Sequence, residues 1–350
     1  MHAQKDIIFT ILTTLFFCVS HLGRAQTAEA WVQKGIQSEK NGDFKNALEC
    51  YSQAVKMEPQ LPTAWFNRGV ARIKLKQYSM AVVDLNKCIL LDTGFQEAYF
   101  NRALALWRSG NLQFALTDVS KYLTYFPAHL AAREMHYSIA IEAEDWDLAI
   151  QDLKLQSLND TLNKLDLMLA TLYEKAGKYD LACKHMERAM SLTPDDVLIQ
   201  HSAAMLFQRT GRYQRSMEIL NRMLLDENIS INLVADVKHL KADNFFFMKD
   251  YVSAADLYAT LLQSDTGNAN LLADYGQCLL QLEKYTDAEI ILTRALKMKN
   301  ASPAYTYLGR GLARVKLQKG NEACEDWEKS YKLGEKAALK YLETYCNKKE

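Results

Sequence analysis

The chain has 350 residues, of which 49% are apolar, 24% are charged and only five are proline. Its 42 basic and 42 acidic residues give a formal net charge of zero, and a balanced chain without a basic tail argues against nucleic acid as the main ligand. Scarce proline with frequent alanine, leucine and lysine favours helix over strand, and the length suits two ordinary domains or one long repeat array.

The first 25 residues have the pattern of a targeting segment. Lys5 gives a short basic start, an apolar run extends from Ile7 to Val19, and the small residues Gly23 and Ala25 follow two positions apart. We expect a secretory signal peptide at 1–25, cut after Ala25. A retained membrane anchor is the less favoured alternative, because the run is shorter than the roughly 20 residues that span a bilayer.

From residue 28 onward, the sequence repeats itself with a regular period of about 34 residues. Such a period is typical of stacked helical hairpins rather than of one globular core. A short polar turn with glycine, such as Asn41-Gly42-Asp43, separates the two predicted helices of a unit, since glycine can take the left-handed conformation that ends a helix. The residues that recur one period apart include Trp31 and Trp65, Gly35 and Gly69, and Ala47 and Ala81.

The array divides into nine units followed by a short end segment. Units one to three occupy 28–129, units four to six 130–230, and units seven to nine 235–333. Unit four, which begins at residue 130, is degenerate. We expect a C-terminal capping helix and tail at 335–350.

Two places in the array depart from the regular period. A few extra residues, 231–234, precede unit seven. Unit nine begins with Tyr305, Leu308 and Gly309, but Ala323 and Trp327 then come two residues late.

Small residues occupy one place on each helix of a unit, where they would let the two helices approach closely. On the predicted first helices they are Gly35, Gly69, Ala103, Ala170, Ala204, Ala242, Gly276 and Gly309. On the second helices they are Ala47, Ala81, Ala115, Ala149, Ala182, Ala254, Ala288 and Ala323.

This pattern resembles the tetratricopeptide repeat (TPR), and the resemblance covers roughly residues 28–333. It implies an all-α fold, a right-handed α-solenoid of about nine TPR helical hairpins with a C-terminal capping helix. It also implies a concave groove, lined by the first helices, in which peptides or helices of partner proteins lie. The residues that carry the resemblance in unit one are Trp31, Gly35, Ala47, Tyr51, Ala54 and Pro59.

Six cysteines follow the predicted signal peptide, and none forms a C-x-x-C pair. Most lie on predicted array helices, where a small apolar packing role is expected. Cys324 and Cys346 flank the last turn of the chain, so a disulfide there would fasten the terminal helix, and packing is the alternative. Their surroundings resemble the closing segment of exported bacterial envelope TPR proteins.

The sequence contains no phosphate loop, no G-x-S-x-G and no H-E-x-x-H motif. His201 and His239 fall at equivalent places in adjacent units, but two histidines without a third ligand make a poor metal site. We therefore predict no enzymatic activity, no catalytic residue, no cofactor, no metal and no small-molecule substrate.

An apolar strip on the first helices of units one to three is the predicted partner-binding site, because groove positions normally meet solvent. Self-association and internal packing are the alternatives. The strip, which we call the N-terminal strip, consists of Val32, Ile36, Phe66, Val70, Phe100, Leu104 and Trp107.

Two further groups of residues bear on binding. Asn67-Arg68 and Asn101-Arg102 resemble part of the dicarboxylate clamp of chaperone-binding TPR proteins, but the other basic residues of such a clamp are missing, so a chaperone-tail receptor is disfavoured. Phe245, Phe246 and Phe247 are consecutive. Phe245 fits a core place, and the other two form a weaker second binding candidate.

These observations together predict a non-enzymatic scaffold or adaptor that binds a partner protein or peptide in its groove. Export through a signal peptide places it in the bacterial cell envelope, either periplasmic or associated with the outer envelope. The alternative is a structural subunit of a larger envelope assembly, which would use convex and terminal surfaces.

Overall fold

The computed structural model describes residues 27–156, 162–226, 229–298 and 303–346, and every regular element in this part of the chain is a helix. The predicted signal peptide, 1–25, lies outside the described residues. Among the helices that are described, none combines the length and apolar character needed to cross a membrane.

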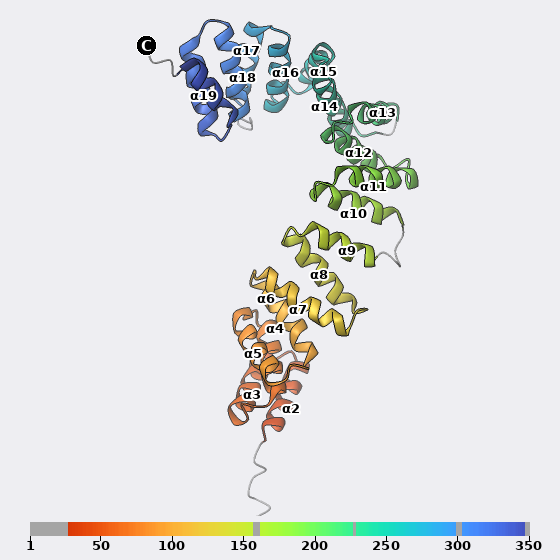
Figure 1. Cartoon of the computed structure of the whole chain (residues 1–350), viewed down its shortest axis with the longest axis vertical. Helices are drawn as coiled ribbons and strands as arrows, with labels where there is room; N and C mark the ends of the chain where they lie inside the picture. Colours follow the sequence, from red (N-terminus) through yellow and green to blue (C-terminus); the bar gives the residue numbers. More distant parts are fainter. Residues whose placement is uncertain (1–26, 157–161, 227–228, 299–302, 347–350) are drawn as a thin grey trace, which may run out of the picture. The chain divides into compact units, whose positions relative to one another are not determined.

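The chain divides into two compact units, residues 1–160 and 161–350, which are described separately. In the first unit each helix packs on the next one along the chain, and four hairpins result (Figure 1). They are α2 (Ala28–Lys40) with α3 (Phe44–Met57), α4 (Pro62–Lys74) with α5 (Tyr78–Leu91), α6 (Gln96–Arg108) with α7 (Leu112–Tyr125), and α8 (Leu130–Glu142) with α9 (Trp146–Gln156).

The second unit contains five hairpins and a terminal helical segment that packs on α19. The hairpins are α10 (Leu162–Lys175) with α11 (Tyr179–Leu192), α12 (Val197–Arg209) with α13 (Tyr213–Met223), α14 (Ile231–Phe247) with α15 (Tyr251–Ser264), α16 (Ala269–Gln281) with α17 (Tyr285–Leu296), and α18 (Pro303–Lys316) with α19 (Gly320–Lys332). The terminal segment is α20 (Ala337–Tyr341) with the π-helix η2 (Leu342–Cys346).

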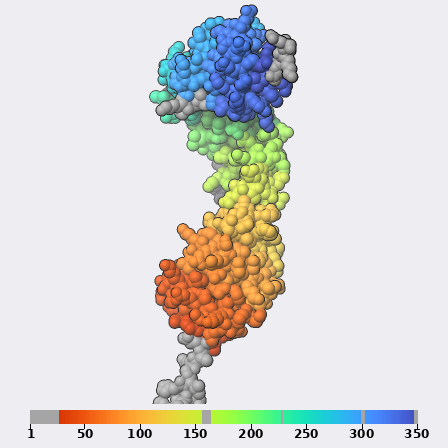
Figure 2. Space-filling model, turned by 90° about the vertical axis from the view of Figure 1, so that its left-hand side faces the viewer, coloured from red at the N-terminus to blue at the C-terminus, as the bar shows by residue number. Residues whose placement is uncertain are grey.

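This arrangement confirms the predicted all-α solenoid of nine hairpins with a terminal helix. Within each unit, the colours of the space-filling view follow the sequence in consecutive bands (Figure 2). Each hairpin therefore builds its core with its neighbours in the sequence, as in other repeat proteins.

One residue in each of these hairpin turns has a left-handed backbone. In four turns it is the predicted glycine, with φ between 70° and 82°. In the other five a longer residue takes φ between 55° and 65°, a conformation that is costly without glycine. The four glycines are Gly42, Gly110, Gly177 and Gly211, and the five longer residues are Lys76, Glu144, Lys249, Glu283 and Gln318.

These left-handed residues mark the register of the array. They recur at the period of the sequence, except for a slightly shorter step after Glu144 and longer steps after Gly211 and Glu283. The step after Gly211 is the longest. It accommodates the extra residues 231–234, which form the first turn of α14 and lengthen that helix to 17 residues.

Glycine allows the closest approach between the two helices of a hairpin. A Cβ on Gly35 would lie 2.8 Å from Tyr51 Cδ1, and a Cβ on Gly69 would lie 2.8 Å from Leu85 Cγ. Both separations are too short for carbon atoms, so the large side chain occupies the space that the glycine leaves. The offset along the chain from the glycine to its large partner is the same in both hairpins.

Unit nine differs from the prediction, because its register is shifted. Gly311, not Gly309, faces the second helix, and its Cβ would lie 2.7 Å from Trp327 Cδ1. The assignment of Gly309 to this role was wrong, since Gly309 faces Gln277 of α16 instead. The offset along the chain from Gly311 to Trp327 equals that from Gly35 to Tyr51. The second half of unit nine is therefore in register with its first half, and the whole unit is shifted toward the C-terminus relative to the predicted period.

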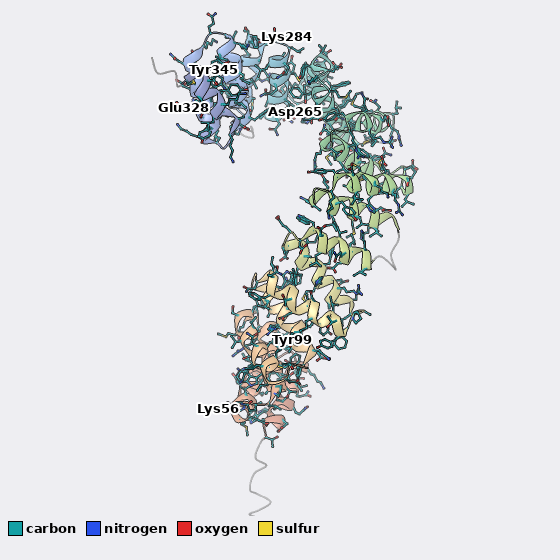
Figure 3. All side chains as sticks on the ribbon, in the orientation of Figure 1. Lys56, Tyr99, Asp265, Lys284, Glu328 and Tyr345 are labelled. Atoms are coloured by element: carbon teal, nitrogen blue, oxygen red, sulfur yellow. A yellow bond between two sulfur atoms is a disulfide. The ribbon has the colours of Figure 1, made fainter. Side chains whose placement is uncertain are left out.

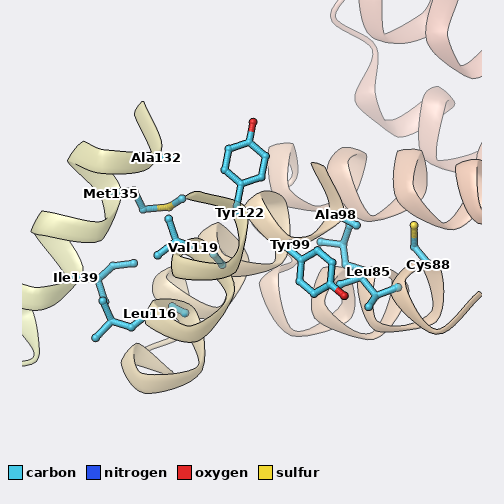
Figure 4. Close-up of a cluster of buried hydrophobic side chains, with 13 residues drawn as sticks. Leu85, Cys88, Ala98, Tyr99, Leu116, Val119, Tyr122, Ala132, Met135 and Ile139 are labelled. Carbon is cyan, nitrogen blue, oxygen red and sulfur yellow. The ribbon is translucent and has the colours of Figure 1, made fainter. Parts of the chain in front are cut away.

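Buried apolar clusters join successive hairpins within each unit. In the first unit, Leu85, Tyr99, Val119 and Ile139 belong to one buried cluster that extends from α5 to α8 (Figure 4). The predicted packing role of the other cysteines is also confirmed, because the free ones are all buried: Cys50, Cys88, Cys183 and Cys278.

Cys324 and Cys346 form a disulfide, with their Cα atoms 5.9 Å apart. It joins α19 to the end of η2. Tyr345 of that segment, which Figure 3 labels, packs its ring on Trp327 with the ring centres 5.6 Å apart. The terminal segment therefore covers the last hairpin through both a covalent bond and an aromatic contact.

Candidate functional site

The N-terminal strip lies within the packing between hairpins. Val32 is buried and the other six members are partly buried, so none is fully exposed. Phe66 contacts the ring of Phe95 at 4.7 Å, and Phe100 contacts Tyr122 at 5.1 Å. These contacts favour the internal-packing alternative for much of the strip.

Trp107, the last member of the strip, is also engaged. Its indole Nε1 donates to Glu142 Oε2 at 2.8 Å, and the Arg108 guanidinium lies 4.6 Å from the ring centre. The hydrogen bond connects α6 to α8, so this side chain helps to join two successive hairpins.

The two arginines that resemble a dicarboxylate clamp are paired within their own hairpins. Arg68 donates to both carboxylate oxygens of Asp84 at 2.7 and 2.9 Å, and Arg102 does the same with Asp118 at 2.6 Å for both bonds. Asp84 is fully buried. Because these guanidinium groups already hold carboxylates of the chain itself, they do not form a ready site for a carboxylate of a partner.

The second unit holds a small cavity of about 90 Å³. Its lining comes from the first helices α14, α16 and α18, with one side chain from the second helix α15. We call it the acidic aromatic pocket. Its lining residues are Asp243, Phe246, Phe247, Tyr258, Asp274, Gln277 and Tyr305.

Two carboxylates and a histidine meet at this pocket. His239 Nε2 lies 3.2 Å from Asp274 Oδ2 and 3.6 Å from Asp243 Oδ1. The Tyr258 hydroxyl donates a hydrogen bond to Asp243 Oδ1. The hydrogen bond to Asp274 raises the pKa of His239 above its ordinary value, and the carboxylates of Asp243 and Asp236 act in the same direction, against burial.

Burial acts on the pKa values of three further groups of the pocket, Asp243, Tyr258 and Tyr305. It raises the pKa of Asp243, although the Tyr258 hydroxyl and His239 oppose this shift. It also raises the pKa of Tyr258, and that of Tyr305 to about 12. Both phenols are therefore neutral near pH 7 and can donate hydrogen bonds.

The buried side-chain amide of Gln277 lacks a hydrogen-bond acceptor among the described residues. The residue is 7% exposed, and its Nε2 has no hydrogen-bond partner among the described residues. Its amide sits against Gly309, where an added Cβ would lie 3.1 Å from Gln277 Cδ. A buried donor without an acceptor costs about 1–3 kcal/mol, so an acceptor supplied from outside would be favourable.

The structure places some predicted residues at this pocket and adds others. Phe246 and Phe247, the weaker binding candidate, line it, and Phe245 is partly buried and packs against a core cluster. His239 finds two carboxylate neighbours, Asp243 and Asp274, so the missing third ligand no longer argues against a metal. One possible ligand atom from each of these three residues lies within 4.8 Å of the other two.

Sequence analysis missed the acidic part of the pocket. Asp243 follows His239 by one turn of the same helix, a spacing that places two side chains on the same face, so this part of the signal was present in the sequence. Asp274 and Gln277 come from the next hairpin, and only the packing of α16 beside α14 and α18 brings them to the same cavity.

Helical hairpins that pack on their neighbours within each unit are typical of α-solenoid scaffolds, and the second unit adds a pocket among its first helices. Models of the tetratricopeptide repeat match residues 40–76, 62–94, 167–196 and 248–314. These segments of the chain therefore match the tetratricopeptide repeat. Such repeats are in general non-enzymatic modules that bind other proteins on extended surfaces.

Solved structures agree with the fold. The structure of Naa15/Naa10 bound to HypK-THB is 12% identical, covers 90% of this chain and 66% of its own, and has a TM-score of 0.54. That likeness shows the fold alone. None of the curated protein sequences matches this chain.

Shorter TPR domains match parts of the chain. The first TPR of Spaghetti (RPAP3), bound to an HSP90 peptide, is 26% identical over 34% of this chain and 94% of its own, with a TM-score of 0.33. The second TPR domain of human RPAP3, in complex with an HSP70 peptide, is 27% identical over 32% of this chain and 93% of its own, with a TM-score of 0.31.

Proposed function

We propose that this chain is a non-enzymatic scaffold that holds a segment of a partner protein against the first helices of its second compact unit. The acidic aromatic pocket is the principal contact. Gln277 carries the proposal, because it lines the cavity and its buried amide nitrogen, which packs against Gly309, has no acceptor among the described residues.

The N-terminal strip is a second proposed contact on the same scaffold. Phe66, Phe100 and Trp107 are already packed against neighbouring side chains. Substitutions there should therefore weaken the fold of the first unit as well as any partner contact, and we expect the larger specific effect at the pocket.

Site-specific photocrosslinking of the full chain in its native cells tests the proposal. One variant carries a photoreactive phenylalanine at Phe247, which is 52% exposed at the pocket. The matched control carries it at Ile290, which is 61% exposed on the second helix α17. A discrete partner that is crosslinked from Phe247 and not from Ile290 supports the scaffold.

The same experiment addresses the alternative function, a subunit of a larger assembly that uses convex and terminal surfaces. That function predicts crosslinks from Ile290 and none from Phe247. Crosslinks from Ile290 alone, or equal products from both positions, would overturn the proposed contact.

We also propose that the protein is exported to the cell envelope. The disulfide between Cys324 and Cys346 supports this, because such bonds persist in oxidising compartments. N-terminal sequencing of the protein from its native cells should give a mature chain that starts at Gln26. A retained Met1, together with free thiols at both cysteines, would contradict export.

A further inference from the structure

We propose that the acidic aromatic pocket binds a basic side chain, lysine or arginine, of the partner segment, and that Gln277 donates to a main-chain carbonyl of the same segment. This inference rests on the scaffold function proposed above and specifies the chemistry of the partner.

The carboxylates of the pocket favour a positively charged ligand. The described residues that line it include two carboxylates, Asp243 and Asp274, and no lysine or arginine. His239 is the one basic group that contacts these carboxylates in the part of the chain that is described. Two other acidic groups, Asp236 and Glu335, act on the pocket from nearby, since they raise the pKa values of His239 and Tyr305.

Aromatic rings form the rest of the lining. Phe246 and Phe247 lie edge to face with their ring centres 5.9 Å apart, and Tyr258 and Tyr305 complete the set. Phe247 and Tyr305 are partly open to solvent, so a side chain can enter between them. A cation over such rings is attracted by their negative faces, and the attraction is stronger when the cation is desolvated.

The amide of Gln277 favours a peptide over a bare metal ion as the ligand of the pocket. Gln277 Nε2 is a hydrogen-bond donor that has no acceptor among the described residues. Every residue of a peptide carries a carbonyl oxygen that could accept this bond. A divalent ion would suit His239, Asp243 and Asp274 but would leave the Gln277 donor unpaired. A segment with a basic side chain satisfies the carboxylates, the rings and the amide together.

The probes are N-acetyl-arginine N-methylamide, its lysine counterpart and its neutral citrulline counterpart, added to chain 26–350. Binding is followed by NMR shifts of the His239 ring and the Gln277 side-chain amide. We expect the arginine and lysine probes to shift both signals with saturation, and the citrulline probe to bind at least about tenfold more weakly, which corresponds to about 1.4 kcal/mol.

Two variants test the assignment to this pocket. Asp243→Asn with Asp274→Asn should lower the affinity for the arginine probe about tenfold or more. The matched control, Asp256→Asn with Asp287→Asn, removes the same charge from exposed positions on α15 and α17 and should leave binding unchanged. If the pocket double variant unfolds, Phe247→Ala replaces it, because that side chain is half exposed.

The outcomes are separable from those of the crosslinking experiment. A partner crosslinked at Phe247 without binding of the basic probes retains the scaffold and overturns the basic side chain. Binding of the probes without a crosslinked partner retains the cation pocket and overturns the scaffold contact. Stoichiometric binding of Zn²⁺ or Mn²⁺ that is lost in the pocket double variant, with no response to the arginine probe, makes this a metal site and overturns the inference.

Discussion

His239 is the residue through which pH should act on the second unit. It faces Asp243 and Asp236 of its own helix, Asp274 of α16 and Tyr258 of α15. Because its pKa is raised in the folded chain, the protonated imidazole stabilises the fold fully below its unfolded pKa of about 6.5, and this stabilisation is lost as pH rises through the folded pKa.

We therefore expect the free energy of unfolding of the second unit to fall as pH rises above about 6.5. Burial raises the pKa of Asp243 as well, which gives a slope of the same sign at lower pH. Urea unfolding between about pH 6 and pH 9 measures the effect, and His239→Gln should flatten the slope in this range. An unchanged slope in that variant would assign the pH dependence to another group.

Gly311 provides the sharpest steric prediction. Gly311→Ala should destabilise the second unit by about 1–3 kcal/mol through overpacking against Trp327. Gly320→Ala is the control, because an added Cβ there meets nothing within 4 Å and Gly320 lies in a helix. Thermal unfolding of both variants checks the register of unit nine. If Gly311→Ala matched the control, the close contact with Trp327 would be wrong.

At the residue scale, the sequence indicated which side chains are aromatic or titratable but not which of them share a cavity. The phenylalanine run pointed to Phe246 and Phe247, and helical spacing could have added Asp243 to His239. The role of Gln277 depends on its amide having no partner among the described residues, which is a property of the packed structure and leaves no mark in the sequence.

At the scale of the hairpin, five of the left-handed turn positions carry a residue other than glycine, although this backbone conformation favours glycine. Lys76→Gly should stabilise the first unit by about 0.5–1.5 kcal/mol, since the left-handed conformation costs a non-glycine residue roughly 1–2 kcal/mol and glycine adds some unfolded-state entropy. Gly110→Ala, at the equivalent turn of α6 and α7, should do the opposite. Urea unfolding of both variants measures the two signs, and equal signs would contradict the shared conformation.

The buried ion pairs hold the two helices of a hairpin together. Asp84 accepts hydrogen bonds from Arg68 and lies 2.8 Å from Arg72 Nη1, and its side chain is fully buried. Asp84→Asn should cost about 3–5 kcal/mol, because it leaves two guanidinium groups without a counter-charge.

The matched control for Asp84 is Asp180→Asn, which removes a carboxylate from the exposed pair with Arg212. An exposed pair contributes roughly 0–1 kcal/mol. Comparable losses of unfolding free energy in the two variants, measured by urea unfolding, would show that burial does not set the strength of the pair in α4 and α5.

The helices could be predicted because small residues and turn glycines recur in the sequence at the repeat period. The register of unit nine was missed because Gly309 and Gly311 both stand near the expected place. The two glycines differ only in what they contact in the folded chain. Gly311 lies against Trp327 of the second helix, whereas Gly309 lies against Gln277 of the neighbouring hairpin.

At the scale of the whole chain, every hairpin is stabilised mainly by its neighbours in the sequence, so a local change should have a local effect. The disulfide between Cys324 and Cys346 lies at one end of the array and closes a segment with a sequence separation of 22 residues. A loop of that size suggests a contribution of about 3 kcal/mol from the restricted unfolded state.

Reduction of this disulfide should therefore increase amide hydrogen exchange in α18, α19 and α20 and leave exchange in α2 to α7 unchanged. Trp327 should remain partly protected, because its ring still packs on Tyr341 at 5.3 Å. Hydrogen exchange followed by mass spectrometry, with and without reductant, resolves these segments. A Cys324→Ala, Cys346→Ala variant should reproduce the reduced pattern, which separates loss of the bond from other effects of the reductant. Increased exchange throughout the chain would instead indicate that the array unfolds as one cooperative unit and that the terminal segment stabilises all nine hairpins.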